Sequence, residues 1–300
     1  MMQNDNAASS AVLCDKCAGC DALYPFACVR QLTPAAWPRA VAPGFYTVVL
    51  RGRTPGPDCG REGCDYTAGT ATFLAPGHCF CPPGPSLSAG AAAFGLSFHT
   101  CLMERVAPPD GRNCFSFFGY AEEESLHLSA RELGVLLGCL EGIADELHWG
   151  VDAFTDALVT DKVSLFLHYC KRFYTRQFIT RGEPNRRLLA LVERRVEAAL
   201  REGRVAAGGQ PSAASLASDA CCSPAYLDDL LRHETGFSTA EYVRRRCFDH
   251  ARHLLLTTRL PVAEVARRSG FVGGRGFAGL FARLTGHSPS AYRRRGVGKV

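Results

Sequence analysis

The chain has 300 residues and a hydrophobic content of 47%, which suits a globular protein of about two domains. No apolar run approaches the roughly 18 residues of a membrane span, and the N-terminus lacks the basic and then apolar order of a signal peptide, so we expect a cytoplasmic protein without a membrane partner. The net charge of +5 is unevenly divided, because residues 184–300 carry 20 basic and 10 acidic side chains while residues 1–183 carry 14 and 19. Such a basic segment indicates a polyanionic partner, nucleic acid or a membrane surface.

Four of the fifteen cysteines are grouped near the N-terminus, in a Cys-rich segment that spans residues 1–40. Cys14, Cys17 and Cys20 have C-x-x-C spacing, and Cys28 follows eight residues later. This spacing is typical of metal sites and thiol-redox sites, so one hypothesis is that the four thiols bind zinc or another metal, or sense oxidation. The alternative is that the thiols serve as small apolar side chains in a core. No other cofactor is expected.

Short apolar runs, separated by turns rich in Gly and Pro, fill residues 41–125. Their sequences are "GFYTVVLRG", "TATFLAPGHCF", "AAFGLSFHT" and "NCFSFFGY". Several short strands at this spacing predict a small barrel or sandwich. His78 and His99 are isolated histidines, and a metal-binding run of paired histidines with a following glutamate is absent. Because no catalytic constellation is recognisable, we do not expect an enzyme.

Two consecutive helices are predicted in residues 126–183. The first begins with a capping box from Ser129 to Glu132, and the second begins near Asp152. The apolar faces can pack on the strands or on a second copy of the chain. Gly182 and Pro184 then mark a hinge into the basic domain. The apolar positions are Leu133, Leu136, Leu140, Ile143 and Leu147 in the first helix, and Phe154, Leu158, Leu165, Tyr169 and Phe173 in the second.

A sequence pattern occurs twice in residues 184–300, at about 212–236 and 262–286. Each copy has a short helix, a tight turn and a second helix that a glycine closes, which is the order of a helix-turn-helix. The matched pairs are Thr235 with Thr285, Gly236 with Gly286, Ser238 with Ser288, Tyr242 with Tyr292 and Leu227 with Phe277 at an offset of 50, and Ala217 with Ala266 and Cys221 with Gly270 at an offset of 49.

The second helix of each copy has clear start, core and stop positions. In the first copy Ser223 is a favourable N-cap, Pro224 suits the first helical position, and Gly236 suits the C-terminal stop. The segment from 238 to 259 predicts one connecting helix that is capped at Ser238. Its roughly 20 residues span about 30 Å, close to the ~34 Å of one DNA turn. The predicted buried positions are Leu227, Leu230 and Leu231 in the first copy, and Phe277, Leu280 and Phe281 in the second.

The second copy also contains the pattern G-x-G-x-x-G, formed by Gly274, Gly276 and Gly279. A dinucleotide-binding turn needs a preceding strand and an acidic residue about 20 positions later. An amphipathic helix precedes this pattern instead, and the sequence supplies no such acid before Val300. We therefore interpret the glycines as part of the turn and of the recognition helix.

Residues 184–300 resemble the DNA-binding domain of the AraC/XylS family of bacterial transcription regulators. The resemblance is carried, in this order, by "ETGFSTAEYV", "LLLTTRLPVAEVA", "GF" at 270 and 271, and "FAGLFARLTGHSPSAYR". It implies an α+β multidomain protein with a cupin-like sensory barrel, whose shared piece is "FLAPG", a helical dimerisation or linker segment, and an all-α domain with two helix-turn-helix units. The implied function is sequence-specific transcription regulation under the control of a small-molecule effector. A metal-responsive or thiol-redox-responsive regulator is the alternative.

The resemblance also implies partners and DNA-contacting residues. The partners are double-stranded DNA, a second copy in a homodimer, an unknown small-molecule effector and, as a further candidate, RNA polymerase. The first recognition helix would present Ala225, Asp228 and Asp229 to base edges, with Ser223, Arg232 and His233 near phosphates; the second would present Gly274, Arg275, Gly276 and Gly279, with Arg283 near the backbone.

Two features of these residues depart from a simple DNA reader. Gly279 has no side chain with which to contact a base, and glycines cost a helix interior about 0.8–1 kcal/mol each relative to alanine. Carboxylates such as Asp228 and Asp229 accept from a cytosine amino group, are repelled by phosphates, or lie on a solvated helix face. Arg275 is the best candidate for direct readout, because arginine is the usual partner of guanine.

Overall fold

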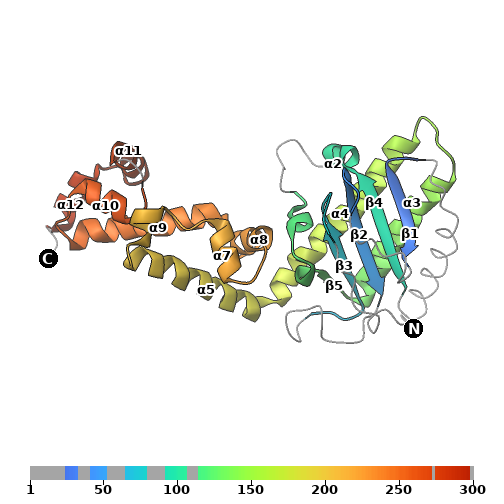
Figure 1. Ribbon diagram of the computed structural model, residues 1–300, viewed down its shortest axis with the longest axis horizontal. Helices are drawn as coiled ribbons and strands as arrows, with labels where there is room; N and C mark the ends of the chain where they lie inside the picture. The colour runs from blue at the N-terminus through green and yellow to red at the C-terminus, as the bar shows by residue number, and fades with distance from the viewer. Residues whose placement is uncertain are drawn as a thin grey trace. The chain divides into compact units, whose positions relative to one another are not determined.

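The computed structural model describes residues 24–32, 41–52, 65–79, 92–106, 114–271 and 274–297. The chain divides into two compact units, Met1–Gly182 and Glu183–Val300 (Figure 1). Strands occur in the first unit, whereas the described part of the second unit is helical. No helix among the described residues is long and apolar enough to cross a membrane.

The first unit is built on an antiparallel sheet. Its strands are β1 (Ala27–Leu32), β2 (Phe45–Gly52), β3 (Gly69–Leu74), β4 (Ala93–His99) and β5 (Leu126–Leu128). The strand order is β1-β4-β2-β3-β5, so β1 and β5 form the edges among the described strands. All six residues of β3 are buried, which is consistent with a strand covered on both faces.

The predicted cupin-like barrel is not confirmed, because the described strands form an open five-stranded sheet. Strand β1 comes from the predicted Cys-rich segment, and β5 comes from the region that was predicted to be helical. Ala27 pairs with Phe98 and Gly69 pairs with Leu128, so the sheet joins segments that are far apart in the sequence. Such pairings cannot be read from the length and spacing of apolar runs alone.

An aromatic cluster joins the sheet to the short helix η1 (Ser116–Gly119). The other short helices described in this part of the chain are α2 (Thr100–Val106) and η2 (Glu122–Glu124). The Phe73 and Phe117 ring centroids are 4.5 Å apart, and Phe117 stacks on Tyr174 at 5.3 Å. These separations are typical of favourable aromatic pairs. The cluster therefore links the sheet to the second long helix, which carries Tyr174.

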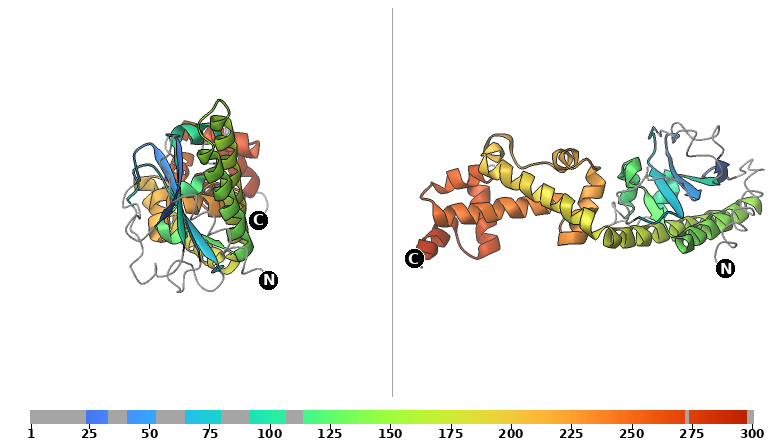
Figure 2. Two further views of the ribbon diagram at one scale, coloured as in Figure 1. Left: turned by 90° about the vertical axis from the view of Figure 1, so that its right-hand side faces the viewer. Right: turned by 90° about the horizontal axis from the view of Figure 1, so that it is seen from below.

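Two long helices, α3 (Ala130–His148) and α4 (Thr155–Thr180), lie along one face of the sheet (Figure 2). The predicted capping box is confirmed: Glu132 N donates to Ser129 Oγ at 3.3 Å, and Ser129 N donates to Glu132 Oε2 at 2.9 Å. The predicted apolar stripe of α3 is also confirmed. Its five positions, Leu133, Leu136, Leu140, Ile143 and Leu147, are all buried.

The predicted apolar face of α4 is largely wrong. Phe154, just before the helix, and Leu158 and Leu165 within it are 70%, 43% and 53% exposed. The buried face instead contains Val159, Val163, Phe166, Leu167, Cys170, Phe173, Tyr174 and Phe178. Because α4 has apolar residues on two faces, helical spacing alone does not distinguish the face that meets the sheet from the face that meets solvent.

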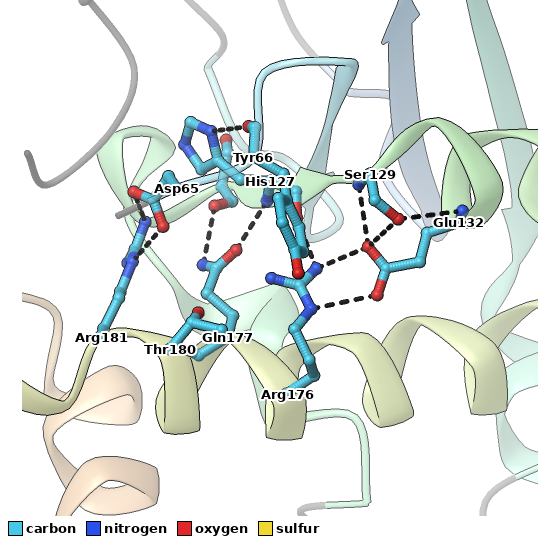
Figure 3. A network of polar contacts seen from close by, with 10 residues as sticks. Asp65, Tyr66, His127, Ser129, Glu132, Arg176, Gln177, Thr180 and Arg181 are labelled. Atoms are coloured by element: carbon cyan, nitrogen blue, oxygen red, sulfur yellow. Dashed lines mark hydrogen bonds and ion pairs between the residues drawn. The ribbon is translucent and has the colours of Figure 1, made fainter. Parts of the chain in front are cut away.

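Polar groups hold the C-terminal part of α4 to β5 and to the segment before β3 (Figure 3). Gln177 Oε1 accepts from His127 N at 2.7 Å, and Arg176 Nη2 donates to His127 O at 2.7 Å. The fully buried Arg181 donates two hydrogen bonds to Asp65, at 2.7 and 2.6 Å. A buried guanidinium requires such a bidentate partner, so this pair fixes the position at which α4 ends.

The predicted hinge is short, because α5 (Gly182–Arg201) begins at Gly182 and only Arg181 separates it from α4. Pro184 lies inside the first turn of α5. A proline is tolerated there because the first N–H groups of a helix have no intrahelical acceptor. The glycine and proline that predicted a hinge therefore lie in the first turn of a helix.

Candidate nucleic-acid interface

The second unit consists of α5 and seven further helices among the described residues. In Figure 1, α9 joins a group that contains α7 and α8 to a group that contains α10, α11 and α12. The helices are α6 (Arg204–Gly208), α7 (Ala213–Asp219), α8 (Pro224–Thr235), α9 (Thr239–Thr257), α10 (Val262–Arg268), α11 (Gly274–Thr285) and α12 (Pro289–Val297).

The turn after α7 and the turn after α10 have the same backbone geometry. Cys222 N donates to Ala217 O at 3.0 Å, and Phe271 N donates to Ala266 O at 2.9 Å. The residue before each donor is left-handed, with φ of 51° at Cys221 and 73° at Gly270. The offset of 49 that relates the two copies upstream is therefore confirmed by matched hydrogen bonds.

The ends of α8 and α11 repeat in the same way at an offset of 50. Gly236 N donates to Arg232 O at 3.0 Å, and Gly286 N donates to Ala282 O at 2.8 Å. Both glycines are left-handed, with φ of 78° and 72°, so they end their helices as the sequence predicted. The chain thus contains two helix-turn-helix units, α7–α8 and α10–α11.

Each helix-turn-helix unit packs on its own end of α9. In the first unit Leu227, Leu230 and Leu231 are buried as predicted, and Leu227 and Leu231 share a cluster with Tyr242 of α9. In the second, Phe277 and Phe281 pack against Leu255 of α9. Leu280 is only half-buried, unlike its counterpart Leu230. The predicted core positions are otherwise confirmed.

The turn of the second helix-turn-helix unit requires glycine at Gly270. A Cβ built on this residue would lie 2.2 Å from Val205 Cγ1, and the φ of 73° is unfavourable for other residues. Val205 lies in α6 and is buried in the core of the first helix-turn-helix unit. This close approach holds the second turn against the core of the first unit.

The predicted connecting helix is α9, whose 19 residues span about 28 Å. Ser238 caps its start, with Glu241 N donating to Ser238 Oγ at 3.3 Å. At its C-terminal end Arg293 of α12 donates to Leu255 O at 3.3 Å and to Leu260 O at 2.6 Å. Both ends of α9 are therefore held by side chains, and the helix provides a fixed spacer between the two units.

The predicted DNA-contacting residues of the first helix-turn-helix unit lie on or beside α8, but one of them has a role within the protein. Asp228 Oδ1 accepts from Thr239 N at 2.7 Å, and its Oδ2 accepts from Arg232 Nε at 2.9 Å. Asp228 thus caps the first turn of α9 instead of lying on a solvated face. Ser223 caps α8 by accepting from Tyr226 N at 3.1 Å. Ala225 and Asp229 are half-buried, while Arg232 and His233 are exposed.

Sequence reasoning missed the contact between Asp228 and Thr239, but the second copy contains a signal from which it could have been predicted. At an offset of 50, Ala278 replaces Asp228 and Pro289 replaces Thr239. A proline has no N–H to satisfy, so the second copy needs no carboxylate at that place. The paired exchange was a usable signal, because a donor and its acceptor are present together in one copy and absent together in the other.

On α11, Gly276, Gly279 and Arg283 are exposed. Gly274 and Arg275 begin this helix, but the side chain of Arg275 lies outside the described residues. The structure therefore places the predicted DNA-contacting residues of the second helix-turn-helix unit on a single helix. Which of them contact bases stays a prediction.

The helix before this one, α10, carries a carboxylate between two arginines. Glu264 accepts from Arg267 at 2.8 and 2.7 Å and from Arg268 at 2.7 Å. These hydrogen bonds, first from Arg267 and then from Arg268, lower the pKa of Glu264 to about 2. The carboxylate stays ionised at neutral pH, and it orders both guanidinium groups on the surface of α10.

The predicted cysteine site can be assessed only in part. Cys14, Cys17 and Cys20 lie outside the described residues. Cys28 lies in β1, where Arg30 Nε donates to its Sγ at 3.0 Å. Within the described ranges no group of three or more His, Cys, Asp or Glu side chains is arranged to hold a metal ion. Binding of metal by the N-terminal cysteines stays a prediction.

Comparison with known proteins assigns the helical domain. A helix-turn-helix domain family matches residues 216–295. The arabinose operon regulatory protein of Escherichia coli K12 is 39% identical over 80 residues, which are 27% of this chain and 27% of that protein. The HTH-type transcriptional activator RhaR of the same strain is 33% identical over 75 residues, 25% of this chain and 27% of that protein. The C-terminal domain belongs to the AraC/XylS family.

The AraC/XylS domain is the part of the chain that these relatives share, and it spans little more than a quarter of their length. Among solved structures, that of ToxT from Vibrio cholerae O395 covers 85% of this chain and 90% of its own. Its sequence identity is 11% and its TM-score is 0.30, which is too low to support a conclusion about the first unit.

Proposed function

We propose that the chain is a sequence-specific DNA-binding transcription regulator. The observation that carries this proposal is the pair of helix-turn-helix units, built on matched hydrogen bonds and held at the two ends of α9. The AraC/XylS assignment of the domain supports it, as do the transcription regulators among the relatives. The excess of basic over acidic side chains in residues 184–300 suits a polyanion.

The proposed mode of binding places α8 and α11 in successive major grooves. The roughly 28 Å length of α9 approaches the ~34 Å repeat of the duplex, which suits two recognition helices on one face of the DNA. Ala225, Asp229 and Arg275 are the proposed base contacts, and His233 and Arg283 the proposed phosphate contacts. Arg232, expected near a phosphate, is left out because it is ion-paired with Asp228 at 2.9 Å. Asp228 is left out because both of its carboxylate oxygens accept hydrogen bonds within the chain.

Regulation by a small molecule through the first unit is part of the proposal. An effector can shift DNA binding only if it binds the two states of the protein with different affinity. The separate compact unit of residues 1–182 provides a place where such a ligand can act without occupying the DNA-binding helices. RNA polymerase is a further proposed partner, on the ground of the regulators that share the domain.

We also propose that two copies pair through the outer face of α4. Trp149, Phe154, Leu158 and Leu165 are exposed, and Trp149 reaches 86%. Exposed apolar side chains grouped along one segment are typical of protein interfaces, whereas single ones are ordinary. A second copy would remove this face from water and place two DNA-binding domains on one operator.

Metal or thiol-redox sensing is the alternative mode of control. It rests on the C-x-x-C spacing of Cys14, Cys17 and Cys20. Zinc and iron analysis of protein purified without oxygen tests it directly. Stoichiometric metal, or a change of DNA affinity on oxidation, is the expected result if these thiols sense; protein free of metal with an unchanged DNA affinity would exclude them.

The main proposal is tested by selection of duplexes from a random pool with the full-length protein. We expect one enriched motif with two conserved blocks separated by about one helical turn, 10–10.5 base pairs from centre to centre. A matched selection with Leu227→Asp, which places a charge in the core beneath α8, should lose one block. Recovery of unrelated sequences by the wild-type protein would refute sequence-specific binding.

A further inference from the structure

The two helix-turn-helix units carry opposite net charge. Residues 212–236 contain four acidic side chains and one arginine, whereas residues 262–286 contain one acidic side chain and four arginines. The formal net charge is therefore −3 in the first unit and +3 in the second. Because phosphate neutralisation supplies most of the sequence-independent affinity for DNA, the two units cannot contribute equally to it.

We infer that the second helix-turn-helix unit supplies most of the electrostatic affinity for the DNA backbone and that the first helix-turn-helix unit supplies little of it. This inference rests on the proposed function and assigns the electrostatic part of the DNA affinity mainly to one of the two helix-turn-helix units. Four observations on the described residues support it: the internal use of Asp228, the pairing of Arg232, the exposed cations of the second unit, and the open surface of α11.

In the first helix-turn-helix unit several charged side chains are paired within the chain. Asp228 caps α9 through Thr239 N, and the same carboxylate holds Arg232 at 2.9 Å. Asp219, at the end of α7, forms an ion pair with Arg195 of α5, with 3.5 Å between Asp219 Oδ2 and Arg195 Nε. The one arginine of this helix-turn-helix unit therefore already has an anionic partner, and moving it to a phosphate would leave Asp228 with less compensation.

In the second helix-turn-helix unit, by contrast, several arginine side chains are exposed to solvent. Arg283 on α11 is exposed and, within the described part of the chain, has no acidic side chain in ion-pair range. Arg267 and Arg268 share the single carboxylate of Glu264, which leaves one positive charge in excess. Arg294 of the adjacent α12 is also exposed. These side chains can neutralise phosphates without giving up a one-to-one ion pair.

The glycines of α11 leave its surface open. Beyond the adjacent backbone of α11 itself, a Cβ built on Gly276 or on Gly279 would meet no atom within 4 Å, so packing inside the chain does not require glycine at either position. Backbone without side chains permits close approach of a ligand. With the exposed Arg283 on the same helix, this surface permits close approach of the duplex backbone.

The inference is tested by the salt dependence of binding to a mixed-sequence 40-base-pair duplex, followed by fluorescence anisotropy from 50 to 200 mM KCl. The matched variants are Arg283→Ala and Arg232→Ala, each of which removes one exposed arginine from a recognition helix. Loss of one phosphate contact reduces the slope of log Kobs against log salt by about 0.9, so the fourfold rise in KCl costs Arg283→Ala about 3.5-fold less affinity than it costs the wild-type protein. Arg232→Ala should keep the wild-type slope.

A charge-gaining pair serves as an independent check. Glu264→Gln removes the single acidic side chain of the second helix-turn-helix unit and should strengthen DNA binding at every salt concentration. Glu234→Gln, in the first helix-turn-helix unit, should change the DNA affinity less. Circular dichroism melting identifies any variant that fails to fold. If Arg232→Ala flattens the slope as much as Arg283→Ala, or if Glu234→Gln has the larger effect, the division of labour is refuted while DNA binding stands. Absence of binding by the wild-type protein at 50 mM KCl would refute the proposed function itself.

Discussion

Asp228 illustrates how a residue on a recognition helix can serve the fold. Its carboxylate reaches the first turn of the next helix and satisfies the N–H of Thr239, which is itself fully buried. A buried N–H without an acceptor costs about 1–3 kcal/mol. Asp228 therefore has a structural role, and a contact between its carboxylate and a base would compete with it. The hydrogen bond from Thr239 to Asp228 also fixes α8 relative to α9, on which the recognition geometry depends.

Asp228→Ala should lower the free energy of unfolding by about 1–3 kcal/mol, because it leaves the buried Thr239 N–H without an acceptor. The double variant Asp228→Ala, Thr239→Pro reproduces the pair found in the second copy and removes the donor as well. Ser238, with φ of −61° and ψ of 160°, already has the extended backbone that precedes a proline. Urea unfolding should therefore find the double variant more stable than Asp228→Ala; equal or lower stability would contradict the capping role.

Arg275 and Arg283 should have different roles in DNA binding. Arg275→Ala is expected to relax the preference at one base position, because arginine donates two hydrogen bonds to guanine at a cost of about 1–3 kcal/mol when lost. Arg283→Ala is expected to weaken all sequences alike, since a phosphate contact carries no sequence information. Competition titrations with single-base variants of the selected duplex measure both effects. Equal losses on every duplex for both variants would refute the division.

Local contacts of single residues could be predicted from the sequence, and distant ones could not. Ser129, Ser223 and Ser238 were predicted as N-caps, and each accepts from the N–H three positions later. The acceptor and donor of such a cap lie within one turn, so the pattern of residue types is sufficient. Asp228 and Thr239 are separated by 11 positions and by the end of a helix, and only the comparison of the two copies reveals the pair.

Helix α4 shows the same limit for a whole element. Its existence follows from helical spacing, but apolar residues occur on two of its faces, and spacing does not specify which one is covered. The structure buries Val163 and Phe166 and exposes Leu158 and Leu165. The helices of the two helix-turn-helix units were easier to predict, because the repeat supports each assignment and because a capping serine or a glycine stop marks several of their ends.

The neighbouring leucines of α4 provide a matched test of its orientation. Leu167 is 0% exposed and Leu165 is 53% exposed. Leu167→Ala should cost about 2–5 kcal/mol through lost burial and the cavity that it leaves, while Leu165→Ala should stay within about 0.5 kcal/mol in the monomer. Urea unfolding at a protein concentration that keeps the chain monomeric measures both. A larger cost for Leu165→Ala would mean that the helix presents the opposite face to the sheet.

At the scale of the molecule, the division into an acidic segment and a basic segment could be predicted, and the strand arrangement could not. The unit boundary at Gly182 lies close to the predicted change of charge near Pro184. The barrel expectation was not confirmed, because short apolar runs specify strands without specifying their partners. Pairing β1 with β4 requires contacts between residues about 70 positions apart, such as Ala27 with Phe98.

The outer face of α4 predicts how two copies associate. Leu158→Glu places a charge among exposed apolar side chains and should shift the protein from dimer to monomer, since a charge buried at an interface without a partner is costly. Thr175→Glu, on an exposed polar position of the same helix, is the matched control and should not change the state. Sedimentation equilibrium measures both variants. A wild-type protein that stays monomeric, or an unaffected Leu158→Glu dimer, would exclude this face.

The most direct test of the account is a hydroxyl-radical footprint of the full-length protein on its selected duplex. Two recognition helices held at the ends of one rigid α9 should protect two patches on the same face of the DNA, about 10–10.5 base pairs apart, for each DNA-binding domain. A single protected patch, or patches whose spacing does not match one turn of the duplex, would contradict the claim that the repeated helix-turn-helix units read DNA together.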